Sequence, residues 1–192
     1  TYIFIHGGDF QIGTESKPFL NTATITLTGD RYKATELPKI GSKCLAVMDR
    51  SGTDPAKGTF IPKHVRGTLD IHGVPRQRVW TLLAEGQHAL AGSTTVTTSE
   101  PVDFKVGDKI VITATAYSFS QSEQRTVVAR PSPTEITLDQ PLLHDHTAHV
   151  YPAQALGHSD VDLRGEVGLL SRNIVIQGDD FSDAQDFGGH TM

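Results

Sequence analysis

The chain has 192 residues, of which 37% are hydrophobic and 20% are charged, and its net charge is −5. This composition is typical of an ordinary globular protein with one sizeable core and excludes a disordered chain. The acidic balance argues against nucleic-acid binding, and the longest apolar run is far too short to enter a membrane. The chain has neither an initiator methionine nor a signal peptide, which predicts a fragment of a longer protein.

Short segments with alternating apolar residues, each followed by a residue that favours turns, recur along the chain. They occupy residues 3–7, 25–29, 45–49, 69–73 and 174–178. The first four recur at a period of roughly 20 residues, which is the sequence signature of a solenoid. No run of apolar residues has helical spacing, so we expect an all-β fold, a right-handed parallel β-helix.

If these segments stack in register, they form one parallel sheet, and their inward residues form one column. The predicted column contains Ile3, Ile5, Ile25, Leu27, Leu45, Val47, Leu69, Ile71, Ile174 and Ile176. The segment 49–65 is expected to project as an insertion between coils, since solenoids accept insertions at their rims. Cys44 lies at an inner or edge position of this pattern and is expected to be a buried small hydrophobe.

The middle of the chain follows a different plan. Strand-like segments at 93–98, 106–113, 125–129 and 135–138 alternate with Gly-Asp and Pro-Ser-Pro turns, which predicts a small antiparallel β subdomain. We therefore expect three parts: first coils at 1–73, an inserted subdomain at 74–163, and a return to the coils at 164–192.

Several strings of residues resemble the G-eight domain, a family named for its eight glycines. These are GGDFQIGTE at 7–15, GTLDIHG at 67–73, WTL at 80–82, VDFKVGDKIVI at 102–112, EVGLLSRNI at 166–174 and FGGH at 187–190. The resemblance covers nearly the whole chain, with the N-terminal part of the domain expected to be missing. Residues 72–76 and 80–81 look closer to the fibrocystin-L branch than to the cell-surface hyaluronidases and the cell-migration-inducing hyaluronan-binding proteins.

The resemblance implies an extracellular or cell-surface β-helix, associated with cilia in some members, within a larger ectodomain protein. The first hypothesis is a non-catalytic scaffold whose partners are extracellular glycans or neighbouring ectodomain chains. The alternative is an enzyme that depolymerises hyaluronan. A third reading is self-association through unpaired strands at open coil ends. No cofactor is expected under any of them.

Under the enzyme hypothesis the resemblance implies that Arg172 holds the substrate, with Asp180 and Asp186 as acid and base. Arginine binds a uronate carboxylate bidentately, and two carboxylates suit glycosidic cleavage. Arg172 matches the family's SRN motif directly, whereas the two aspartates match only loosely. A structural alternative remains open, in which Arg172 bonds the backbone carbonyls of a coil corner.

Further binding candidates are Trp80 and His190. Trp80 suits a sugar-stacking platform, or alternatively a half-buried aromatic that seals the seam between the coils and the insertion. His190 belongs to a polar cluster that also includes Arg172, Asn173 and the acidic residues after Gly178.

Two segments carry candidate metal ligands, but a metal is expected at neither. His144 and His146 share a face of a strand, and His149, His158, Asp160 and Asp162 follow, but the spacing matches no known zinc pattern. The acidic loop 179–186 offers oxygen ligands for calcium but lacks the glycine and terminal glutamate of the helix-loop-helix calcium pattern.

Overall fold

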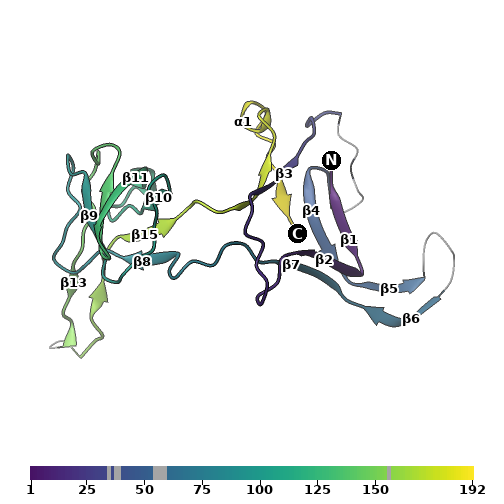
Figure 1. The fold of residues 1–192 in the computed structure, drawn as a ribbon, viewed down its shortest axis with the longest axis horizontal. Coiled ribbons are helices and arrows are strands. Elements are labelled where there is room, and N and C mark those ends of the chain that lie inside the picture. Colours follow the sequence, from purple (N-terminus) through teal and green to yellow (C-terminus); the bar gives the residue numbers. More distant parts are fainter. Residues whose placement is uncertain (34–35, 37–39, 54–59, 155–156) are drawn as a thin grey trace. The chain divides into compact units, whose positions relative to one another are not determined.

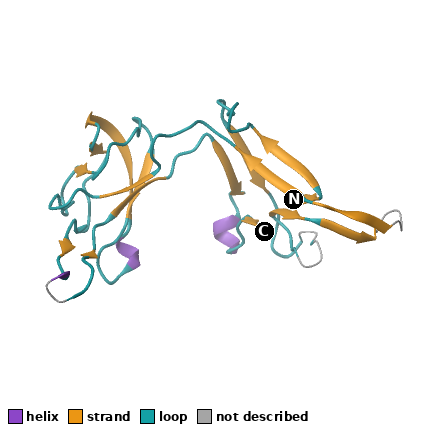
Figure 2. Cartoon of the chain, turned by 90° about the horizontal axis from the view of Figure 1, so that it is seen from below, coloured by secondary structure: helices purple, strands orange, loops and turns teal. Residues whose placement is uncertain are grey.

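Strands and loops make up most of the protein, and the helical segments are short (Figure 2). The computed structural model describes residues 1–33, 36, 40–53, 60–154 and 157–192, and for residues 51–53 and 60–64 it describes the backbone only. The chain divides into two compact units. The coil unit contains Thr1–Pro75 and Arg172–Met192, and the insert unit contains Arg76–Ser171.

Short parallel sheets form the coil unit (Figure 1). The parallel pairs are β1 (Ile3–His6) with β4 (Cys44–Met48), β2 (Gly8–Ile12) with β7 (Gly67–Ile71), and β3 (Ala23–Leu27) with β16 (Ile174–Gly178). β17 (His190–Thr191) then joins the sheet of β1 and β4, again in parallel. The chain therefore passes three sheets in the order β1, β2, β3 and passes them again in the order β4, β7, β16.

The predicted single column of apolar residues is wrong. Ile3 does pair with Leu45 and Ile5 with Val47, but Ile25 pairs with Ile176 in a second sheet and Leu69 with Phe10 in a third. The reason is that one passage of the chain contains three strands, not one. The period of roughly 20 residues therefore measured the spacing between neighbouring sides of a coil, not between whole coils.

An antiparallel hairpin separates β4 from β7. An insertion was predicted here between coils, but β4 and β7 belong to the same passage, so the hairpin lies within a coil. It consists of β5 (Arg50–Thr53) and β6 (Phe60–Val65). The short helix α1 (Ser182–Gln185) lies between β16 and β17.

The insert unit is a curled antiparallel sheet. Its strands are β8 (Trp80–Leu82), β9 (Thr95–Thr97), β10 (Lys109–Ile112), β11 (Glu123–Ser132), β12 (Glu135–Leu138) and β15 (Glu166–Leu169), in the order β8-β15-β10-β11-β12-β9. A bridge between Leu83 and Thr98 joins the ends of the two edge strands, so the sheet closes on itself. The unit also contains the 3-10 helix η1 (Phe119–Gln121) and the hairpin of β13 (Val150–Tyr151) and β14 (Val161–Asp162).

Alternating burial along the strands builds the core of the insert unit. In β10 and β12, for example, every second residue is buried, which is the period of a strand with one face inward. The buried apolar residues form one cluster: Leu83, Ala89, Val96, Val102, Phe104, Ile110, Ile112, Val127, Ile136, Leu138, Leu142, Ala148, Val167 and Leu169.

The return to the coils was expected at residue 164. In the structure, β15 pairs with β10 and β8, and the next parallel strand of the coil unit is β16. Cys44 is completely buried beside Ile40 and Ala46, as predicted, and burial raises the pKa of its thiol. Within the described residues, no helix combines the length and apolar character needed to cross a membrane.

Candidate functional site

The three residues of the catalytic hypothesis are all exposed side chains of the coil unit. Arg172 precedes β16, Asp180 follows it, and Asp186 caps α1 in a left-handed conformation with φ 46°. A hollow of about 380 Å3 lies beside this segment, lined by Gly29, Asp30, Asp179, Phe181 and Gln185. None of the three predicted residues lines it.

The two carboxylates that do line this hollow are held in the ionised state. The pKa of Asp30 is lowered, chiefly because its side chain accepts a hydrogen bond of 2.8 Å from the backbone N–H of Tyr32. The pKa of Asp179 is lowered, chiefly by the Lys43 ammonium and then by the N–H of Gly29. A glycosidase needs one carboxyl group with a raised pKa to protonate the leaving oxygen, and this pair does not supply it.

Lys43 is the residue that organises this region, and the sequence analysis missed it. Its side chain is completely buried and its backbone has a left-handed φ of 58°. The Nζ atom donates to Asp179 Oδ1 at 2.9 Å, Ser182 Oγ at 3.0 Å and Phe187 O at 2.7 Å. These three acceptors match the three N–H groups of an ammonium. Lys43 therefore ties the start of β4 to the segment between β16 and β17.

Asn173 of the SRN motif bonds backbone groups at a coil corner. Its Nδ2 donates to the carbonyls of Phe19 and Asn21, both at 2.8 Å, and its Oδ1 accepts from the N–H of Val74 at 2.8 Å. Gly73 lies so close that a methyl group there would overlap Asn173 Oδ1. The amide thus satisfies corner backbone groups and holds two distant segments of the coil unit together.

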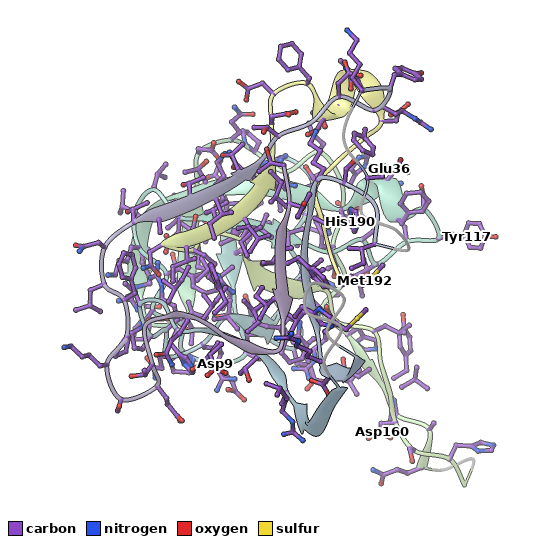
Figure 3. All side chains as sticks on the ribbon, turned by 90° about the vertical axis from the view of Figure 1, so that its right-hand side faces the viewer. Asp9, Glu36, Tyr117, Asp160, His190 and Met192 are labelled. Carbon is purple, nitrogen blue, oxygen red and sulfur yellow. The ribbon has the colours of Figure 1, made fainter. Side chains whose placement is uncertain are left out.

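Trp80 and His190 belong to different units. Trp80 lies in β8 opposite Gly168, with 49% of its surface exposed. His190, labelled in Figure 3, lies in β17, and its Nε2 donates to Ile40 O at 3.2 Å. His190 also lines a hollow of about 390 Å3 with Leu27, Ile176, Gln177, Gly189 and Thr191.

The histidine-rich segment serves the structure of the insert unit. His146 is completely buried, with Nδ1 at 2.8 Å from Thr113 O and Nε2 at 3.1 Å from Glu123 Oε1. Burial raises the pKa of Glu123, but hydrogen bonds from Leu143, His146 and His144, together with the charge of Arg125, outweigh burial and lower it. In the part of the chain that the structure describes, no three His, Cys, Asp or Glu side chains are grouped to hold a metal.

Comparisons with known proteins give the family. The G8 domain model matches residues 1–84. Fibrocystin-L of Mus musculus is 39% identical over 178 residues, and fibrocystin of the same species is 31% identical over 173 residues. These matches cover 91% and 90% of this chain, but the chain spans only 4% of the length of each relative.

Among solved structures, the tailspike protein gp49 from Pseudomonas phage LKA1 aligns with 93% of this chain and 25% of its own, at 17% identity and a TM-score of 0.36. This likeness is too distant to bear on function. The sequence relationships are the informative ones, and they agree with the resemblance inferred from the glycine-rich strings. The chain contains a G8 domain and is homologous to fibrocystin-L and fibrocystin over most of its length.

Proposed function

We propose that this chain is a structural and interaction module of a larger fibrocystin-like protein at the cell surface or on a cilium. The observation that carries the proposal is the repeated order of the parallel pairs β1–β4, β2–β7 and β3–β16, in a chain homologous to fibrocystin-L. In a solenoid, each coil of the chain adds a strand to the same sheets, and each coil packs against the next.

The coils form the start of a right-handed parallel β-helix, and the insert unit is a side domain carried on it. β17 supports this reading because it adds a further parallel strand to β4. The module acts as a scaffold and contacts extracellular glycans or neighbouring chains. An experimental structure of a longer segment tests the winding: further coils in the same hand are expected, and a break after β17 with no continued stacking would contradict it.

The alternative function is hyaluronan cleavage through Arg172, Asp180 and Asp186. None of these three residues lines the adjoining hollow, so no shared substrate position for them supports this chemistry. We expect the full ectodomain that contains this chain to leave high-molecular-weight hyaluronan at unchanged length. Shortening that is lost in Arg172→Ala, and kept in the control Arg66→Ala at another exposed arginine of the coil unit, would establish the enzyme instead.

A further inference from the structure

A third hollow, in the insert unit, has the features of a binding site. Its volume is about 450 Å3, within the range of roughly 300–1,000 Å3 typical of small-molecule sites. Polar side chains dominate its lining, which includes Thr115, Gln121, His144, Asp145 and Thr147. They come from two segments that are distant in sequence, before and after β11 and β12.

Buried hydrogen bonds fix the positions of these two segments. Glu123, which is 95% buried, accepts from the backbone N–H groups of Leu143 and His144, each at 2.9 Å. The N–H of Thr147 donates to Thr115 Oγ1 at 2.8 Å, directly at the hollow. His146, one residue from Asp145 and Thr147, anchors the segment to Glu123 and to the carbonyl of Thr113. The hollow is therefore built before any ligand arrives, which lowers the entropic cost of binding.

The loop that supplies one wall of the hollow also carries two exposed aromatic side chains. Between its lining residues Ala116 and Gln121, the chain carries Tyr117, which is fully exposed, and Phe119, which is 89% exposed. Figure 3 shows Tyr117 projecting outward, clear of its neighbouring side chains. Exposed rings beside hydrogen-bonding groups suit a ligand that has both apolar faces and polar edges.

We infer that this hollow, together with Tyr117 and Phe119 of the loop between its lining residues Ala116 and Gln121, binds a neutral saccharide. A sugar ring offers C–H faces to the aromatic rings and hydroxyl groups to the amide, hydroxyl, imidazole and carboxylate groups of the hollow. The lining contains no lysine or arginine and includes the carboxylate of Asp145, so an anionic polymer such as hyaluronan is disfavoured. The inference deepens the proposed role as an interaction module and rests on it.

The site differs from the binding residues expected from the sequence. Trp80, Arg172 and His190 do not line it. Its aromatic residues were not singled out because the segment 114–122 has no strand periodicity and reads as a loop. The signal was two aromatic residues, Tyr117 and Phe119, among serines and alanine.

The test is an array of neutral and acidic oligosaccharides probed with the whole chain, followed by titration of the strongest binder against its backbone amide NMR signals. We expect neutral saccharides to bind, with shifts at residues 115–121 and 143–147. Tyr117→Ala and Phe119→Ala should each weaken binding roughly two- to tenfold, because an aromatic contact contributes roughly 0.5–1.5 kcal/mol. The matched control is Tyr32→Ala, since Tyr32 is 85% exposed but belongs to the coil unit.

Three outcomes overturn the inference: an array with no specific signal, preference for acidic saccharides, or binding that survives both aromatic substitutions. Self-association that Phe119→Ala abolishes, without saccharide binding, would identify the surface as a protein interface instead. Each of these leaves the scaffold role standing, because that role is tested separately by the winding of the coils and by hyaluronan chain length.

Discussion

The coil unit and the insert unit differ in how their sheets treat the unpaired backbone groups of edge strands. The insert unit joins its outermost strands through Leu83 and Thr98 and surrounds a continuous apolar cluster. Among the described residues of the coil unit, the sheets β2–β7 and β3–β16 have two strands each, and β1 and β16 contain no fully buried residue. A closed sheet is self-sufficient, whereas a coil gains much of its burial from the coils stacked on it.

The largest effect is expected from emptying the core of the insert unit. Ile110 is completely buried within that core, so Ile110→Ala should cost about 2–5 kcal/mol. Urea unfolding followed by the fluorescence of Trp80, the only tryptophan of the chain and part of this unit, measures the loss. Amide exchange in β3 and β16 should not change. Accelerated exchange there would show that the two units unfold as one body.

The next largest effect is expected in the coil unit, from Lys43→Met. The substitution leaves Asp179, Ser182 Oγ and Phe187 O without their shared donor. Losing the hydrogen bonds of a charged donor is destabilising, and we expect the melting temperature of the coil unit to fall by roughly 6–12 °C. Amide exchange of β4 and β16 reports on it. The control is Lys17→Met, at an exposed lysine, and an equal loss in both variants would contradict the role of Lys43.

Asn173→Ala should have a smaller effect. It removes three hydrogen bonds to backbone groups, and unsatisfied backbone groups cost about 1–3 kcal/mol. Thermal unfolding detected at the coil unit measures the change. Asn21→Ala serves as the matched control because it keeps the backbone carbonyl that Asn173 contacts. Equal stability of Asn173→Ala and this control would contradict the prediction, because it would mean that water replaces the Asn173 amide without loss of stability.

The smallest effect is a local one at low pH. The Arg164 guanidinium bonds both oxygens of Asp162 and lowers the pKa of that carboxyl from 3.8 to about 2. Because the folded pKa lies below its ordinary value, the contact stabilises the hairpin above about pH 4 and is lost as the pH falls towards 2. NMR shifts of Arg164 Nε–H should follow this titration, and Asp162→Asn should abolish it. A midpoint near 3.8 would refute the ion pair.

The sequence predicts the individual strands better than their arrangement. The segments around Ile25, Leu45 and Ile174 are strands as expected, and so are the middle segments that became β9 to β12. Their partners were misassigned because β2 was not recognised between the glycines Gly7 and Gly13. Without β2, the spacing of the remaining strands suggests one strand per coil, so strands on different sides of one coil were assigned to successive coils. Alternation reveals which residues share a face, but parallel pairing depends on contacts that are distant in sequence.

The polar residues that matter most were the hardest to predict. Lys43 precedes an apolar strand, where a lysine is usually solvent-exposed, and its buried position depends on acceptors that lie more than 130 residues later in the chain. Asn173, next to Arg172 in the same motif, bonds the backbone carbonyls of a coil corner. The resemblance identified the motif, and the geometry adds the role of Asn173.

The contact of Asn173 with Val74 has an evolutionary consequence. Val74 is close to the point where the chain leaves the coil unit, and Asn173 is close to the point where it returns. A single amide therefore fastens the exit and the re-entry of the polypeptide using atoms of the coil unit alone. Whatever sequence is spliced between these two anchors can be lengthened, shortened or replaced during evolution, while the path of the winding stays the same.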